Sequence, residues 1–186
     1  TYLTLRRETG GSPLAENDDG GGDGTNSLIV HTLPEDGVYV LEARPLNAEE
    51  TGAYELKLEE TAPEREPAPL AFGAKIAEAS ITDDDPKDEE DRGFDSYIIQ
   101  GEAGQRLQAI MRSGDFDTYL RIGKAGESFE ELASDDDGLG RGTDSRLNFT
   151  VPETGRYVLR ASPLTSDEDG LYSLELIDRG PEPSPG

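Results

Sequence analysis

Cysteine is absent from this chain of 186 residues, and histidine occurs once. Without cysteine the chain forms no disulfide and offers no thiolate metal ligand, although this absence does not distinguish the cytoplasm from the exterior. A Ser-His-Asp or Cys-His catalytic arrangement needs a histidine or a cysteine, so any such site would depend on His31. Nucleophilic catalysis of these kinds therefore has little to build on here.

Basic residues are few: 17 Lys and Arg face 41 Asp and Glu, for a formal net charge of -24. This charge opposes binding to nucleic-acid phosphates and to anionic membrane surfaces. A strongly acidic surface is typical of a well-solvated protein, and calcium is the leading specific alternative.

Long apolar runs are also missing. No stretch approaches the roughly 18 residues that span a bilayer, and no basic region with an apolar core marks a signal peptide, so membrane insertion is not expected. Hydrophobic residues make up 33% of the chain, while Gly (22) and Pro (12) are plentiful. This composition favours alternating strands over buried helices and predicts an all-β chain.

The chain contains a domain-sized internal repeat. The segment from Asn17, "NDDGGGDGTNSLIVHTLPEDGVYVLEARPL", aligns with the segment from Asp135, "DDDGLGRGTDSRLNFTVPETGRYVLRASPL", about 118 residues later, with about half of the positions identical. Upstream, "TYLTL" at Thr1 matches "TYLRI" at Thr118. The stretch from about Leu70 to Asp117 precedes the second match and has no counterpart before the first.

These matches give four segments. Residues 1–60 are expected to be the C-terminal half of a first repeat, 61–70 a Pro-rich linker, 71–178 a complete second repeat and 179–186 a Pro-rich tail. Half of a sheet structure exposes unpaired strand edges and an apolar face. We therefore expect residues 1–60 either to pair with a strand-completing or domain-swapped partner chain or to be poorly ordered.

Strand positions follow from period-two alternation. Leu147, Phe149 and Val151 alternate with polar residues, and two further strands follow through residues 156–161 and 172–176. The stretches "FDSYIIQ", "RLQAIM", "FDTYLRI" and "FGAKIAEASI" add more strands, and "SFEELA" is a candidate turn of helix. Seven or eight strands in roughly 105 residues indicate a β-sandwich, because a one-sided sheet needs a second sheet over its apolar face.

The ordered motifs "DSY", "AGQ", "DFDTYL", "GRY" and "GLYSLEL" resemble the bacterial pre-peptidase C-terminal domain. The likeness covers the whole second repeat and the later half of the first. The resemblance implies a jelly-roll-like antiparallel β-sandwich, found outside the catalytic domain of secreted or periplasmic bacterial proteins, often peptidases. It also implies an accessory role, as in the related collagen-binding modules of clostridial collagenases.

Two candidate sites come with this resemblance. Some relatives bind calcium through acidic residues in the linker before the first strand, which here correspond to Asp83, Asp84 and Asp85. Collagen-binding relatives use aromatic side chains on one sheet, which makes Tyr97, Tyr119 and Tyr157 candidates for a ligand face. The alternative is packing in the core and at strand corners, which is the interpretation for the tyrosines that recur at matching strand positions, Tyr39, Tyr54, Tyr157 and Tyr172.

The loop "SDDDGLGRGTDSRL" offers Asp135, Asp136, Asp137 and Asp144 with flexible glycines, the oxygen-rich chemistry that calcium prefers. Its spacing is not that of an EF-hand, so a solvated hairpin loop is the competing interpretation. A phosphate cradle is disfavoured because the loop is anionic and lacks the Lys-Ser/Thr of a P-loop. Asp115 and Asp117 enter a strand on one side, either as ligands or as turn caps.

No catalytic constellation emerges. His31 aligns with Phe149, an inward strand position, which favours a packing role over a catalytic base. Acidic residues are too abundant for any carboxylate pair to indicate glycoside chemistry. Two functions remain: a non-catalytic accessory module that contacts protein or polysaccharide with possible calcium stabilisation, or a purely structural acidic spacer without a ligand.

Overall fold

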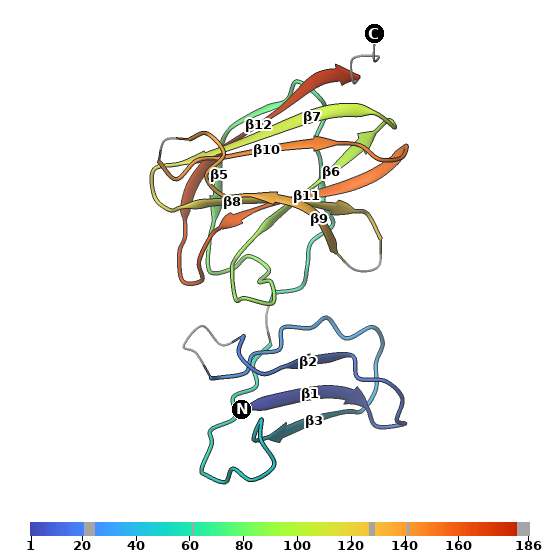
Figure 1. Cartoon of the computed structure of the whole chain (residues 1–186), viewed down its shortest axis with the longest axis vertical. Coiled ribbons are helices and arrows are strands. Elements are labelled where there is room, and N and C mark those ends of the chain that lie inside the picture. Colours follow the sequence, from blue (N-terminus) through green and yellow to red (C-terminus); the bar gives the residue numbers. More distant parts are fainter. Residues whose placement is uncertain (21–24, 61, 127–128, 141, 182–186) are drawn as a thin grey trace. The chain divides into compact units, whose positions relative to one another are not determined.

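The computed structural model describes residues 1–20, 25–60, 62–126, 129–140 and 142–181, and its described elements are all β-strands (Figure 1). The predicted all-β fold is confirmed. The chain divides into two compact units, residues 1–64 with 87–91 and residues 65–86 with 92–186. The second unit begins inside the expected linker 61–70, and most of the expected tail 179–186 lies outside the described residues.

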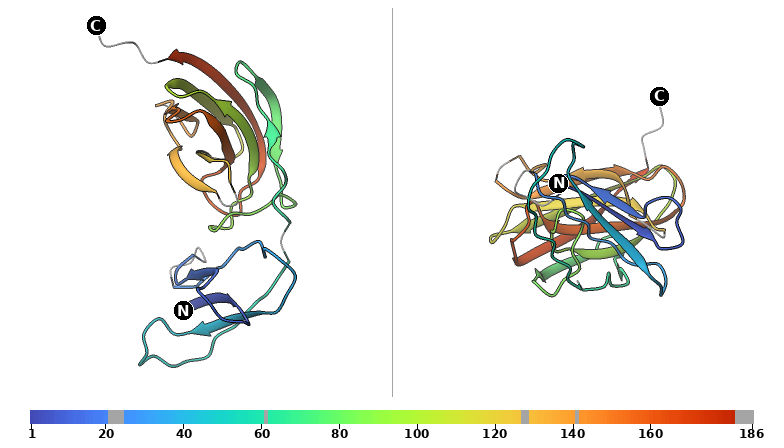
Figure 2. Two further views of the ribbon diagram at one scale, coloured as in Figure 1. Left: turned by 90° about the vertical axis from the view of Figure 1, so that its right-hand side faces the viewer. Right: turned by 90° about the horizontal axis from the view of Figure 1, so that it is seen from below.

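The second unit is a β-sandwich of two sheets (Figure 2). A four-stranded sheet has the order β10-β7-β12-β5, and a five-stranded sheet has the order β4-β6-β11-β8-β9. All pairings are antiparallel except that of β4 with β6. The strands are β4 (Ala68–Pro69), β5 (Lys75–Ile81), β6 (Asp95–Gly101), β7 (Gln105–Ser113), β8 (Thr118–Lys124), β9 (Glu130–Asp135), β10 (Ser145–Thr150), β11 (Gly155–Pro163) and β12 (Gly170–Pro181).

The core lies between these sheets and follows the alternation of the sequence. Alternate side chains of each strand point into the sandwich, where burial of one large apolar side chain contributes about 1.5–3 kcal/mol. The described members of the hydrophobic core all belong to the second unit. Its fully buried large apolar side chains are Tyr157, Ile81, Ile99, Leu107, Met111, Leu120, Ile122, Leu159, Leu174, Leu176 and Val151.

The first unit contains a single three-stranded sheet in the order β2-β1-β3, formed by β1 (Tyr2–Arg7), β2 (Ala15–Asn17) and β3 (Tyr39–Arg44). This sheet repeats the β9-β8-β11 part of the second unit with the same register. Leu3 lies opposite Asn17 and Ala43, as Leu120 lies opposite Asp135 and Ala161. The first repeat therefore folds locally as the second one does.

Two segments of the first unit depart from the repeat. Residues 28–33 and 54–58 align with β10 and β12, but neither segment is a strand in the described structure. In the second unit β7 pairs with both β10 and β12, and no described strand of the first unit takes that place. His31 accordingly lies exposed instead of at the expected inward strand position.

The expected turn of helix in "SFEELA" is wrong. Its described residues enter β9, which pairs with β8 through Ile122 opposite Ala133, while Ser128 lies outside the described residues. The cross-strand ladder overrides the helix preference of Glu and Leu, since local propensity is worth only tenths of a kcal/mol per residue. No described segment forms an apolar helix long enough to cross a membrane.

Candidate functional site

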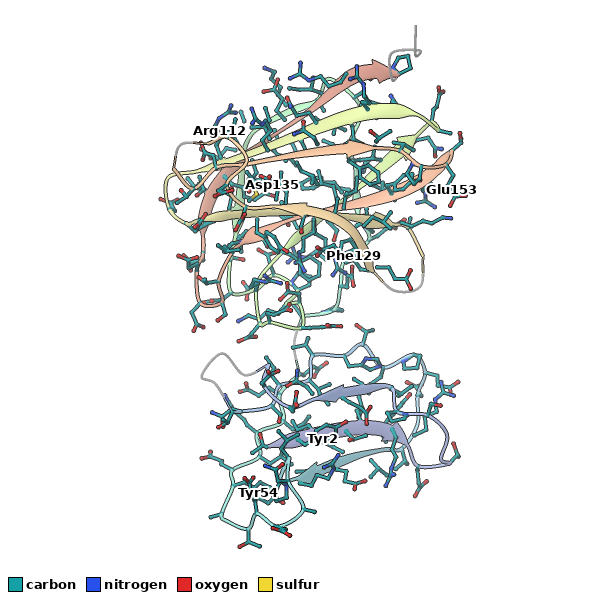
Figure 3. The ribbon with its side chains drawn as sticks, in the orientation of Figure 1. Tyr2, Tyr54, Arg112, Phe129, Asp135 and Glu153 are labelled. Carbon is teal, nitrogen blue, oxygen red and sulfur yellow. The ribbon has the colours of Figure 1, made fainter. Side chains whose placement is uncertain are left out.

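The acidic loop between β9 and β10 is closed by the Asp135 side chain (Figure 3). Asp135 Oδ1 accepts hydrogen bonds from the backbone N–H of Gly138 at 2.8 Å and of Arg146 at 2.6 Å. A Cβ at Gly138 would lie 2.3 Å from Asp135 Oδ2, so the close approach requires glycine. The bonds connect the five-stranded sheet, where β9 ends, to β10 of the other sheet. We call this arrangement the loop latch.

The first unit has the same latch with an amide in place of the carboxylate. Asn17 Oδ1 accepts hydrogen bonds from the backbone N–H of Gly20 at 2.7 Å and of Leu28 at 2.9 Å. A neutral oxygen therefore serves at this position without a negative charge. Asp23 of the same loop lies outside the described residues.

A second contact recurs beside each latch. The backbone N–H of Ser145 donates to Thr118 Oγ1 at 2.8 Å, and the backbone N–H of Ser27 donates to Thr1 Oγ1 at 2.9 Å. Both contacts join the start of a strand of one sheet to the segment that follows the loop. Their recurrence supports a structural role for the loop.

In the linker before β6, Asp85 is buried and engaged by protein groups. Its Oδ2 accepts the backbone N–H of Thr82 at 2.8 Å, and its Oδ1 accepts the Arg65 guanidinium at 2.7 Å. Protein groups therefore engage both carboxylate oxygens of Asp85. The neighbouring Asp83 and Asp84 are exposed.

Asp115 and Asp144, which lie next to strand ends, also accept hydrogen bonds from protein groups. Asp115 Oδ2 accepts the backbone N–H of Leu171 at 2.8 Å, so Asp115 fixes the start of β12. Asp144 Oδ1 accepts the backbone N–H of Ser113 at 3.4 Å. These two side chains hold strand ends, which matches the turn-capping interpretation.

Asp117 is the exception among the candidate aspartates. Its Oδ1 is buried without a hydrogen-bond partner. Burial raises the pKa of its carboxyl, and the negative charges of Asp136, Glu168 and Asp137 raise that pKa further. These carboxylates repel one another, yet no group of three or more acidic or histidine side chains in the described part of the chain is placed to hold a metal ion. Calcium binding stays a prediction from the sequence.

The expected ligand face of three tyrosines is corrected by the structure. Tyr97 and Tyr157 point into the core and are buried, so they offer no ring surface to a ligand; Tyr119 is partly exposed. The Tyr157 hydroxyl donates to the carbonyl of Glu153 at 2.7 Å. Tyr97 and Tyr157 share the inward parity of Ile99 and Leu159, which determines their direction.

Tyr97 takes part in a polar bridge between the sheets. The Tyr172 hydroxyl of β12 donates to Asp95 Oδ2 at 2.6 Å and lies 2.6 Å from the Tyr97 hydroxyl of β6. Burial raises the pKa of Asp95, although the bond from Tyr172 lowers it in part, and burial also raises the pKa of the Tyr172 phenol. The three groups satisfy one another inside the sandwich, which indicates a structural bridge.

A different group of residues stands out on the outer face of the five-stranded sheet. Arg121 of β8 and Arg160 of β11 lie directly opposite each other, both are outward by parity, and they are only 5% and 8% exposed. The Arg160 guanidinium lies 4.2 Å from the ring centre of Phe94 and 4.1 Å from that of Phe129, the residue labelled in Figure 3. We call these four residues, together with Tyr119, the arginine–aromatic layer.

Tyr119 completes this layer, with its ring centre 5.3 Å from the Arg121 guanidinium. Like charges placed directly opposite each other destabilise a sheet, whereas stacking on aromatic faces offsets part of that cost. Sequence reasoning found Tyr119 but missed the two arginines. Their positions in the alternating pattern could have found them, because each arginine directly follows an inward leucine, Leu120 or Leu159, and so points outward.

No family model and no curated protein matches the sequence. Among solved structures, the chain is similar to the pre-peptidase C-terminal domain of a collagenase from Bacillus anthracis, with 17% identity over 63% of this chain and 99% of that one, at a TM-score of 0.48. This is the family that the sequence motifs resemble.

Two further similar structures are PliG proteins, periplasmic inhibitors of g-type lysozyme. The one from Aeromonas hydrophila has 13% identity over 59% of this chain and 94% of its own, at a TM-score of 0.41. The one from Salmonella Typhimurium has 19% identity over 60% and 98%, at a TM-score of 0.38.

Proposed function

We propose that the chain is a non-catalytic accessory module of an exported bacterial protein, and that its second unit binds a protein partner on the outer face of the five-stranded sheet. The partly exposed rings of Tyr119 and Phe129, which lie over the buried guanidinium groups of Arg121 and Arg160, carry this proposal. Aromatic side chains are enriched in the centres of protein-binding interfaces.

The surroundings of the layer favour a protein over a polysaccharide. Leu132 of the edge strand β9 is 49% exposed, which adds an apolar side chain to the face that carries the aromatic rings. A partner that presents apolar side chains complements both features. The accessory role and the exported location rest on the family resemblance of the sequence motifs.

The test is a binding screen of the whole chain against arrays of extracellular proteins and polysaccharides, followed by titration of each hit with variants. Leu132→Ser is the probe and Leu171→Ser is the matched control, because both leucines are 49% exposed but Leu171 lies on β12 of the other sheet. We expect Leu132→Ser and Phe129→Ala each to weaken a protein ligand about tenfold, as loss of a hot-spot side chain does.

Equal weakening by Leu171→Ser would contradict the assignment of the face. A screen that yields polysaccharide ligands alone would contradict the protein partner. A screen without any hit would favour the spacer.

A further inference from the structure

The outer face of the four-stranded sheet carries a group of arginines. On β7, Leu107, Ala109 and Met111 are buried in the core, so Arg106 and Arg112 point outward by alternation. The neighbouring strands β10 and β12 add further outward side chains to this face (Figure 1). We call the outward residues Arg106, Ile110, Arg112, Arg146, Ile177 and Arg179 the basic face.

The register of the three strands places these residues side by side. Arg146 of β10 lies opposite Ile110 of β7, and Ile177 of β12 lies opposite Gln108 of β7. Arg179 belongs to the same face, because its guanidinium donates to Gln108 Oε1 at 2.5 Å. The basic face therefore has guanidinium groups around two isoleucines.

Positive charge is in excess on this face, although the whole chain has 41 acidic and 17 basic residues. Among the described residues that point outward by parity from β7, β10 and β12, Glu175 alone is acidic. Its carboxylate already pairs with Lys75 of β5 at 2.8 Å, and the exposed Glu78 of β5 lines the same small pocket as Arg112. The four arginines of the three strands thus outnumber the carboxylates around them.

Uncharged groups hold two of the guanidinium groups in place. Arg106 donates to the carbonyl oxygens of Arg179 at 2.9 Å and of Gly180 at 3.4 Å. Arg179 donates to Gln108, which in turn donates to Asn148 Oδ1 at 2.8 Å. Such a network fixes the direction of the positive charges without neutralising them.

The other two arginines have no close carboxylate among the described residues. Arg112, labelled in Figure 3, has its Nε 3.9 Å from Asp144 Oδ2, which is beyond hydrogen-bond distance. Arg146 Nε has no hydrogen-bond partner in the described part of the chain. A guanidinium group binds a carboxylate with two parallel hydrogen bonds, so this face suits carboxylates from another molecule.

We propose that the basic face binds an extended acidic segment of a partner polypeptide, with carboxylates on alternate residues. Arg106 and Arg112 are separated along β7 by about 20 Å, a distance that six or seven extended residues span. Alternate side chains of such a segment point to the same side and meet the guanidinium groups together. This site lies on the other sheet from the face proposed above, and neither depends on the other.

The chemistry of the basic face favours a polypeptide over a nucleic acid or a polysaccharide. No aromatic side chain points outward from β7, β10 and β12 within the described residues, since Phe149 and Tyr172 lie at inward positions. Nucleic-acid bases would find no ring to stack on, and the net charge of -24 repels dense phosphates. Sugar rings would also find no aromatic surface, whereas Ile110 and Ile177 offer contact to an apolar side chain of a polypeptide.

The test titrates the whole chain into two labelled ten-residue peptides and follows fluorescence anisotropy at about 50 mM salt. One peptide alternates Glu and Ser, and its matched control alternates Gln and Ser. We expect the Glu peptide to bind with a Kd on the order of 100 μM and the Gln peptide at least tenfold more weakly. Binding of the Glu peptide is expected to disappear at about 1 M salt, where the Debye length falls to about 3 Å.

Matched variants locate the bound peptide. Arg146→Gln and Arg179→Gln each remove one charge from the basic face and are expected to weaken the Glu peptide about fivefold. Arg156→Gln is the control, because it removes the same charge from an exposed residue of β11 on the other sheet, and we expect a change within about twofold. Thermal unfolding of each variant checks that the fold is kept.

Several results would overturn the proposal. One is no binding of the Glu peptide at about 1 mM, and another is equal binding of the Glu and Gln peptides. Equal weakening by Arg156→Gln would show that the net charge acts instead of the basic face. Binding of polygalacturonate without binding of the Glu peptide would make a polysaccharide the occupant. Self-association of the chain in sedimentation at low salt, if Arg146→Gln abolishes it, would make a second copy the occupant.

Discussion

The loop latch makes a prediction that separates a structural aspartate from a metal ligand. Asp135→Ala removes the oxygen that accepts from the backbone N–H groups of Gly138 and Arg146. Both N–H groups are then left partly buried without an acceptor, and the connection between the end of β9 and the start of β10 is lost.

The expected cost follows from the two bonds. A hydrogen bond to a charged acceptor contributes about 1.5–3 kcal/mol, and the lower value applies here because the latch is only partly buried. Two such bonds give a loss of about 3 kcal/mol in the free energy of unfolding of the second unit. For a unit of this size that corresponds to a fall of about 10–20 °C in Tm.

Two variants separate the latch from the other interpretations of the acidic loop. Asp135→Asn keeps the accepting oxygen, as Asn17 does in the first unit, and is expected to stay within about 1 kcal/mol of the native chain. Asp137→Ala changes an exposed side chain of the same acidic run and is expected to stay within about 0.5 kcal/mol. Scanning calorimetry of the three variants, with chelator and with calcium, measures the differences.

The latch is refuted if Asp135→Ala unfolds like the native chain, or if Asp137→Ala is equally destabilised. A metal ligand would give another result: Asp135→Asn would lose stability in calcium and not in chelator, since an amide replaces a carboxylate poorly around calcium.

Three further outcomes follow from the same contacts. Gly138→Ala is expected to lower the free energy of unfolding by about 2 kcal/mol in calorimetry, because its Cβ would collide with the fixed Asp135 carboxylate, and an unchanged Tm would contradict this. The pKa values of Asp95 and Asp117 are raised above the ordinary 3.8, so the folded state binds protons more tightly and stability falls as pH rises from below 3.8 through the raised values. Asp117→Asn should raise Tm at pH 7 and flatten this dependence in urea unfolding, and an unchanged pH slope would argue against the charge cluster. Calcium added to chelator-stripped protein is expected to shift Tm by less than about 1 °C, whereas a larger rise would support the calcium prediction from the sequence.

Much of the fold could be predicted from alternation and the repeat, because both report which face of a strand is buried. The same parity supports the core-packing alternative for Tyr157, which lies two residues before the inward Leu159. The proposed role of the tyrosines came from a family resemblance, and the resemblance does not specify direction. The arginine–aromatic layer was missed because Phe94 and Phe129 come from loops, whose course no periodic pattern determines.

The hydrogen bonds of the loop latch could not be predicted from the sequence, although the alignment of its two key residues could. The sequence brings Asn17 and Asp135 into alignment, yet it does not say that one side-chain oxygen bridges two backbone N–H groups, 3 and 11 residues later. Consecutive aspartates are typical of both cation sites and turns, and composition alone does not separate the two. The substitution of Asn for Asp between repeats was the available clue, because an accepting oxygen is what the two residues share.

The two repeats also show that a strand pattern is not sufficient to form a strand. Residues 28–33 and 145–150 have related sequences, but only the second segment is paired, with β7. A strand gains its stability from backbone bonds and side-chain packing with its neighbours, so the same local sequence folds or stays open according to the partner it meets. The first unit has its β9-β8-β11 equivalent in register and its latch closed, but Tyr54 and Leu56 are exposed where Tyr172 and Leu174 are buried. The same two positions are therefore core positions in one repeat and surface positions in the other, because among the described strands only the second repeat has β7 and β5 beside them.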